Sequence, residues 1–262
     1  MTPTSDYLEK CRELLVGVAA QEETIQRAAE WFAKAIASGR VVHLFGSGHS
    51  RIAVEEMWPR YGSFPGFHPI VELSLTYHNQ VVGANGQRQA MYLENVAGFA
   101  ERILRNFDIS EKDAALVVSS SGCNRVPIEV AEILRAKGVR VVAIVGRRHA
   151  EASSSRHPEG LKLHDIADLV LDTGVPPGDA MVLVDGLETP VSPGSTLAAV
   201  ALVNAIKCEV ADRLTRAGAP PRVLTAACLV GAERSAELSE AAYDEHAHRV
   251  ARILENVGRP RS

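Results

Sequence analysis

Two short serine- and glycine-rich stretches contain the residues whose types and spacing point most directly to chemistry. Residues 119–124 read S-S-S-G-C-N, and residues 46–50 read G-S-G-H-S. Each follows a short apolar run and precedes a segment with helical spacing. Such a loop brings backbone N–H groups and hydroxyls to the positive end of a helix. The pattern therefore predicts anion sites, most naturally for a phosphate.

Residues 119–124 have two other possible roles. A nucleophilic serine of the hydrolase type needs a G-x-S-x-G pattern, which none of the three serines has. A plain helix cap needs only a serine near the helix start, so that alternative stays open. Residues 46–50 begin like the dinucleotide pattern G-x-G-x-x-G, but Arg51 replaces the third glycine, and no G-K-[ST] is present. We therefore expect a small phosphorylated ligand and no cofactor.

Several acidic and imidazole side chains follow these loops and are candidates for proton transfer. Glu55 and Glu56 stand on a helix after the first stretch and must face different ways, so we expect one at the site and one in solvent. A surface or capping role is the alternative for every candidate. The full set of candidate catalytic residues is Glu55, Glu56, His49, His78, Glu94 and His157.

Metal binding and disulfides are not predicted. His43, His49, His68 and His78 are close in sequence but form no H-x-x-x-H or H-E-x-x-H pair. The four cysteines form no C-x-x-C pair, which is typical of a reducing compartment.

The elements that must position these residues alternate along the chain. Two helical patterns occupy residues 5–38, and one long helix is predicted over about 92–107. Apolar runs without polar alternation predict buried parallel strands covered on both faces. In such sheets ligands bind at the carboxyl ends of the strands, where both serine stretches fall. The five expected strands are 41–45, 67–72, 114–118, 139–145 and 168–172, and later helices are expected at 195–217 and from 235 onward.

Composition excludes several classes of protein. The 262 residues are 46% apolar and 23% charged with a net charge of −4, which argues against a large basic nucleic-acid surface. No apolar run approaches the roughly 20 residues that span a bilayer. The first residues lack a basic and then apolar signal segment, so we expect a cytoplasmic location, with neither nucleic acid nor membrane as partner.

The order of the motifs resembles that of the sugar isomerase (SIS) domain family. After the two serine stretches come V-V-A-I-V-G, A-D-L-V-L-D and S-P-G-S-T, so the resemblance covers about residues 30–217. The chain is most similar to uncharacterised, phosphoheptose-isomerase-like members. The resemblance implies a flavodoxin-like α/β fold: a doubly wound, five-stranded parallel sheet flanked by helices. It also implies a homodimer or homotetramer with sites near subunit interfaces.

The same resemblance implies domain limits, a ligand and site residues. Residues 1–38 would be helices packing on an SIS domain at 39–217, and 218–262 a C-terminal extension with a helix. The family's S-x-S-G loop holds the phosphate of a sugar phosphate. The residues carried over as phosphate ligands are Ser119, Ser121, Gly122 and Asn124, with Ser47 as the next match.

The expected activity is aldose–ketose isomerisation of a sugar phosphate. Phosphoheptose isomerases carry a histidine and a glutamate after the first loop, and a glutamine and a histidine on the late helix. Here the first helix has glutamates but no histidine, and the late helix has neither the glutamine nor the histidine. No zinc site is therefore expected. Two alternatives remain: a glutamate-based lyase that cleaves an ether from a muramic acid phosphate, and a non-catalytic sugar-phosphate sensor or regulator that binds a partner.

Overall fold

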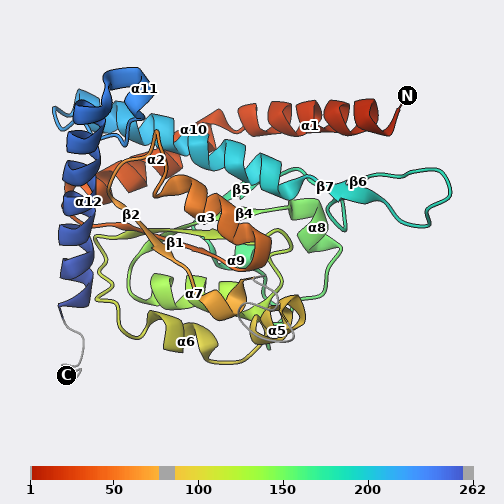
Figure 1. Cartoon of the computed structure of the whole chain (residues 1–262). Helices are drawn as coiled ribbons and strands as arrows, with labels where there is room; N and C mark the ends of the chain where they lie inside the picture. The colour runs from red at the N-terminus through yellow and green to blue at the C-terminus, as the bar shows by residue number, and fades with distance from the viewer. Residues whose placement is uncertain (1, 77–85, 256–262) are drawn as a thin grey trace.

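A five-stranded parallel sheet forms the centre of the computed structural model, which describes residues 2–76 and 86–255 (Figure 1). The strands are β1 (Val42–Gly46), β2 (Phe67–Ile70), β3 (Ala114–Val118), β4 (Arg140–Val145) and β5 (Leu169–Asp172). Their order, β2-β1-β3-β4-β5, is that of the flavodoxin-like doubly wound fold, so the predicted fold class is confirmed. The chain reverses its direction of travel across the sheet between β1 and β3, which is where ligands bind in such sheets.

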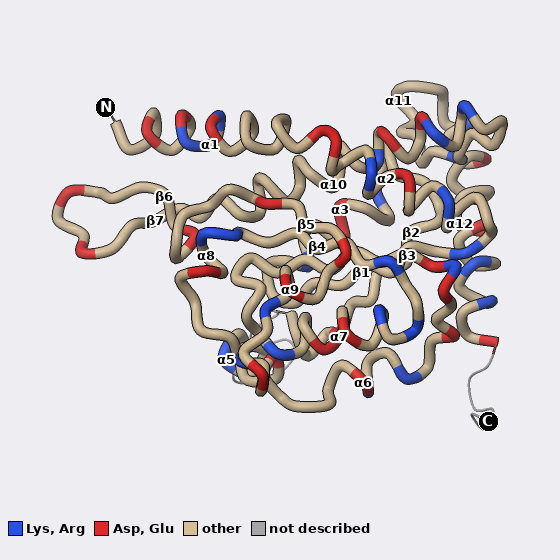
Figure 2. The backbone as a smooth tube through the Cα atoms, turned by 180° about the vertical axis from the view of Figure 1, so that it is seen from behind, with Lys and Arg blue, Asp and Glu red and all other residues tan. Residues whose placement is uncertain are grey.

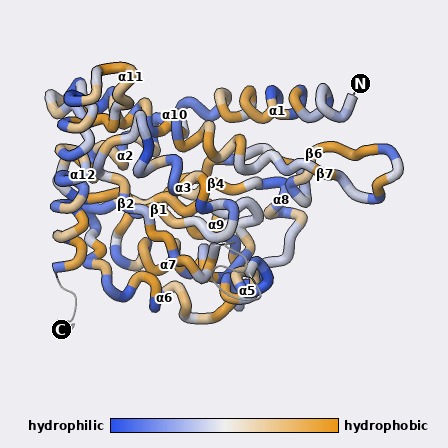
Figure 3. Tube along the Cα trace, in the orientation of Figure 1, coloured by the Kyte–Doolittle hydropathy of each residue, from blue (hydrophilic) through white to orange (hydrophobic). Residues whose placement is uncertain are grey.

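Successive strand residues face opposite sides of the sheet, and each side has its own core. Leu44 and Leu116 lie in one apolar cluster, while Phe45 and Val117 lie in the other. The first side is covered by α2 (Glu22–Ala37), α3 (Arg51–Met57) and α10 (Ser195–Arg216). The second is covered by α6 (Phe99–Leu104), α7 (Arg125–Ala136) and α9 (Leu163–Ile166). Figure 3 shows hydrophobic residues concentrated along the central strands, as expected for strands buried on both faces.

The predicted helix over residues 92–107 is wrong. The structure has α5 (Gln87–Leu93) and α6, separated where Gly98 adopts a left-handed backbone conformation with φ 73°. The residues between them turn to meet the start of α7. The Val126 amide donates to the Glu94 carbonyl at 2.9 Å, and the Arg125 amide donates to Asn95 Oδ1 at 3.4 Å. Glu94 and Asn95 thus accept hydrogen bonds from the first amides of α7, and the helix that begins at Gln87 does not continue.

The chain also builds an arm that the sequence did not predict. Strands β6 (Ala180–Val182) and β7 (Val191–Pro193) form an antiparallel hairpin that projects from the body beside α1 (Pro3–Ala19) (Figure 1). Lys10 Nζ donates to the Met181 carbonyl at 2.7 Å and joins the two. On α1, Cys11, Leu14 and Val18 are buried. Leu8 and Leu15 on the same helix remain 49% and 44% exposed.

Short elements and the C-terminal helices complete the fold. They are η1 (Gly48–Ser50), η2 (Leu73–Leu75), α8 (Arg147–Glu151), α11 (Ala227–Val230) and α12 (Ala232–Leu254). Helix α12 packs against the segments that lead into β1 and β3: Arg249 donates to the Arg40 carbonyl at 2.8 Å, and the Asp108 amide donates to the Ile253 carbonyl at 2.7 Å. Figure 2 shows Lys and Arg intermixed with Asp and Glu along the outer helices. Across the two described ranges, no helix is long and apolar enough to cross a membrane.

Candidate functional site

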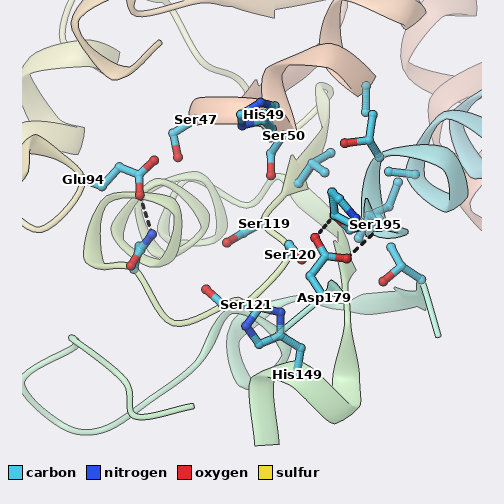
Figure 4. A pocket seen from close by; sticks show the side chains of 18 of the residues that line it. Ser47, His49, Ser50, Glu94, Ser119, Ser120, Ser121, His149, Asp179 and Ser195 are labelled. Carbon is cyan, nitrogen blue, oxygen red and sulfur yellow. Dashed lines mark hydrogen bonds between the residues drawn. The ribbon is translucent and has the colours of Figure 1, made fainter. Parts of the chain in front are cut away.

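A cavity of about 530 Å³ opens at the carboxyl ends of β1, β3 and β4, beside the start of α10. Figure 4 shows the side chains that surround it. Residues from both predicted serine stretches line it, together with α5, α8 and the segment before α10. Parallel strands end at one edge of a sheet, so the fold brings together loops that are about 70 residues apart in sequence.

The serine loop, residues 119–124, joins β3 to the start of α7. The Ser119 hydroxyl accepts from the Gly122 amide at 3.2 Å, and the Ser121 hydroxyl accepts from the Cys123 amide at 3.3 Å. A hydroxyl that accepts in this way still has its own hydrogen to donate. Gly122 has φ 62°, a left-handed backbone conformation that residues with a side chain rarely adopt, so glycine allows the turn. Ser119, Ser121 and Asn124 line the cavity, and Gly122 shapes the turn between them.

The first loop, residues 46–50, folds back tightly after β1. A Cβ on Gly46 would lie 2.7 Å from the Ser50 carbonyl oxygen, and Gly48 has φ 55°, so both glycines are needed for this turn. The turn directs Ser47, His49 and Ser50 to the cavity. Ser47 is buried and His49 is exposed at the rim.

Glu94 is the buried carboxyl group of this cavity and is only 4% exposed. Asn124 Nδ2 donates to Glu94 Oε2 (Figure 4), and the Ser47 hydroxyl also favours the ionised form of the carboxyl group. Burial raises the pKa of Glu94 above its ordinary value, while these two donors act in the opposite direction by favouring the ionised form. A buried carboxyl group whose charged form is stabilised by neighbouring donors is suited to taking up and releasing a proton.

Asp179 and Ser195 lie across the cavity from Glu94 (Figure 4). Asp179 Oδ1 accepts from the Ser195 amide at 2.8 Å, and Asp179 Oδ2 accepts from the Ser195 hydroxyl at 2.5 Å. This pair holds the start of α10 against the cavity. Sequence reasoning missed Asp179, although the turn sequences P-P-G-D and S-P-G-S-T on either side of the hairpin marked the segment.

Three other predicted catalytic residues lie outside the cavity. Glu55 is exposed and 3.7 Å from Arg51 Nε, and Glu56 turns toward α10, where it accepts from Asn204 Nδ2 at 3.0 Å. The expectation that one of these two glutamates faces the site is therefore corrected: Ala53 is the α3 residue that lines it. His157 Nε2 lies 3.3 Å from Glu132 Oε1, away from the cavity. His78 lies outside the described residues.

The histidines considered for metal binding separate into two places. His43 and His68 pair across β1 and β2, with 3.1 Å between their Nδ1 atoms, and His43 Nε2 lies 3.2 Å from Asp113 Oδ2. His49 lies beyond the opposite end of β1. In the part of the chain that the structure describes, no three His, Cys, Asp or Glu side chains form a metal-binding group.

Comparisons with known proteins agree with this architecture. A family model described as SIS domain matches residues 6–146. A UPF0309 protein of Geobacillus thermodenitrificans is 33% identical over 228 residues, which cover 87% of this chain and 89% of that protein. A UPF0309 protein of Listeria innocua is 30% identical over 254 residues, covering 97% and 99%. A phosphoheptose isomerase from Francisella tularensis has a TM-score of 0.50 at 16% identity over 80% of this chain and 98% of that chain, a likeness of fold alone.

Proposed function

Because the chain belongs to the SIS domain family, we propose that it binds a phosphorylated sugar and interconverts its aldose and ketose forms. The observation that carries this proposal is the position of Glu94. It is a buried carboxyl group with a raised pKa, in the same cavity as the serine loop. An isomerase needs a proton-transfer group of this kind at a fixed distance from the group that grips its substrate.

The serine loop supplies the phosphate grip. The hydroxyls of Ser119 and Ser121 donate to the phosphate, and Asn124 stands at the N-cap of α7, whose positive end favours an anion. Ser47 reaches the same space from the first loop. Neutral hydroxyl and amide donors leave the bound phosphate easy to release, since no ion pair has to be broken.

Glu94 moves the proton between the two carbons. In its ionised form it removes the proton from the carbon next to the carbonyl, which gives an enediolate, and then returns that proton to the former carbonyl carbon. The hydroxyl proton must pass in the same direction, from the oxygen on the deprotonated carbon to the former carbonyl oxygen. We assign that transfer to Ser47 and His49, the first-loop residues that line the cavity.

A double variant of the serine loop tests the phosphate grip. Ser119→Ala with Ser121→Ala removes both donors while the loop amides remain, so we expect a folded protein that sugar phosphates no longer stabilise against heat. Ser154→Ala, an exposed serine outside the cavity, is the matched control. Thermal stabilisation by a sugar-phosphate panel that is equal in the double variant and the wild type would contradict the assignment.

The same panel separates the isomerase from its two alternatives. Conversion between aldose and ketose phosphates, followed by NMR, is the outcome we expect. Release of lactate from muramic acid 6-phosphate would instead identify the lyase. Stabilisation without turnover of any panel member would identify a sensor.

We further propose that the protein assembles as a homodimer or homotetramer. Leu8 and Leu15 are seven residues apart, so they share one face of α1, and Val16 beside them is 69% exposed. The neighbouring hairpin adds Leu187, which is 49% exposed. An apolar face on a projecting helix supports contact with a second copy of the chain.

A further inference from the structure

Three polar atoms on one side of the cavity are buried and lack a hydrogen-bond partner among the described residues. They are Ser120 Oγ, His149 Nδ1 and Thr173 Oγ1. All three residues line the cavity. A buried polar atom without a partner costs about 1–3 kcal/mol. Three such atoms facing one space indicate a place for a ligand that supplies their hydrogen bonds.

The loops that carry these atoms are fixed against one another at Gly146. The Gly146 amide donates to the Ser120 carbonyl at 2.9 Å. A Cβ built on Gly146 would lie 3.2 Å from both the Ser120 carbonyl oxygen and Thr173 Oγ1. His149 follows on α8, three residues further along the chain. The ends of β3, β4 and β5 therefore hold the three unpartnered atoms on a packed support.

The side of the cavity that holds these three atoms carries a negative charge, that of Asp179. Asp179 faces it, beside Ser120 and Ser195 in Figure 4. The Asp179 carboxylate accepts from the Gly194 amide, the Ser195 amide and the Ser195 hydroxyl, which leaves about one of its four lone-pair positions for a ligand donor. Among the cavity residues that the structure describes there is no Lys or Arg. Asp179 already caps the positive end of α10, so an anion placed here would meet a carboxylate with no cationic side chain to offset it.

Ser120, His149, Thr173 and Asp179 define what we call the hydroxyl lobe of the cavity. We propose that the hydroxyl lobe binds the uncharged, hydroxyl-bearing end of a sugar monophosphate and rejects a carboxylate or a second phosphate at that end. This inference rests on the proposed function, because the phosphate must occupy the serine loop for the other end to reach the lobe. The hydroxyl lobe thereby orients the substrate, and it selects sugar monophosphates whose other end is uncharged over those whose other end is acidic.

Matched probes test the charge selectivity directly. D-Glucitol 6-phosphate and 6-phosphogluconate share the phosphate and the six-carbon chain, but C1 is a hydroxymethyl group in the first and a carboxylate in the second. D-Mannitol 6-phosphate and its acid, 6-phosphomannonate, form a second pair. By calorimetry we expect at least one alditol phosphate to bind about tenfold more tightly than its acid and than inorganic phosphate.

Variants test the residues. Ser120→Ala with Thr173→Val removes two unpartnered hydroxyls with little change in shape. It should weaken the alditol phosphate about tenfold and leave inorganic phosphate unaffected. Asp179→Asn should reduce the difference in affinity between an alditol phosphate and its acid. Ser154→Ala should leave all of these affinities unchanged. The two Ser120 and Thr173 substitutions keep the test valid if the Asp179 variant fails to fold.

The outcomes distinguish this inference from the proposed function. If inorganic phosphate and the alditol phosphates bind the wild type equally, or if the Ser120 and Thr173 variant binds the alditol phosphates as the wild type does, the hydroxyl lobe is overturned while the phosphate grip stands. Preferred binding of the acids overturns the selectivity in the same way. If no phosphate compound binds at all, the proposed function fails first, and the inference falls with it.

Discussion

At the scale of single residues, the same polar side chains hold the loops in place and have hydrogen-bonding positions left for a ligand. The hydroxyls of Ser119 and Ser121 accept hydrogen bonds that close the loop, and each still has its own hydrogen to donate to a ligand. Glu94 is buried enough to favour its neutral form, yet two donors stabilise its charge. Its protonation is therefore adjustable by single substitutions.

Removing one of those donors should shift the pH dependence of turnover. Without the Asn124 amide the ionised form of Glu94 loses a hydrogen bond, so its pKa rises further. Because the base must be ionised, the acid limb of the kcat–pH profile in Asn124→Ala should move to higher pH. Ser47→Ala should move it in the same direction.

The control for this prediction is Ser50→Ala, which lines the cavity without a hydrogen bond to Glu94. It should leave the acid limb in place. An acid limb at the same pH in Asn124→Ala and the wild type would show that another group limits the rate at low pH.

At the scale of elements, the amino ends of β1 and β2 and the segment before β3 are joined by a buried polar cluster. Arg40 and His43 both contact the Asp113 carboxylate, and His43 contacts His68. If both rings are neutral, His43 donates from Nε2 to Asp113 and accepts at Nδ1, so His68 donates from its own Nδ1. Burial, the neighbouring His43 and His246 lower the pKa of His68 to about 3.

This cluster makes stability depend on pH in a defined window. Between pH 6.5 and about 3 the unfolded chain binds a proton at His68 that the folded chain does not, so the free energy of unfolding falls as the pH falls. One such group contributes a slope of at most about 1.4 kcal/mol per pH unit. His68→Gln should therefore have a shallower dependence than the wild type in urea unfolding between pH 4.5 and 7.5.

The comparison concerns slopes, because the substitution also changes packing and so the absolute stability. The fold lowers the pKa of Asp113 from its ordinary 3.8, so this carboxyl group changes the free energy of unfolding mainly below pH 4.5. The effect is also common to both proteins. Equal slopes in the two proteins would mean that His68 does not resist protonation in the folded state.

At the scale of the whole molecule, prediction from the sequence succeeded where the signal was local or belonged to the family. The SIS family and the five-stranded fold are confirmed, and both serine stretches lie at one cavity. Asp179, His149 and Thr173 were missed because strand order, not sequence distance, brings them together. The phase of the short helix α3 could not be predicted either, since its packing against α10 turns Glu56 away from the site.

The assembly proposal also belongs to this scale. Light scattering after size-exclusion chromatography should give the wild type a mass of two or four chains. Leu8→Glu with Leu15→Glu puts two charges on the exposed face of α1 and should lower that mass with little effect on folding, because both side chains are about half exposed. Glu13→Gln, also exposed on α1, is the control. A wild type with the mass of one chain would contradict the proposal.

Solvent deuterium incorporation tests the central claim most directly. With a sugar phosphate that the protein turns over in D₂O, NMR should show deuterium entering at the carbon next to the carbonyl in the wild type. In Glu94→Gln, which keeps the shape but loses the base, the rate should fall by about 10²–10⁴-fold while the sugar phosphate still binds. Equal rates of incorporation in the two proteins would contradict the account, because the proton would then be moved by a residue other than Glu94.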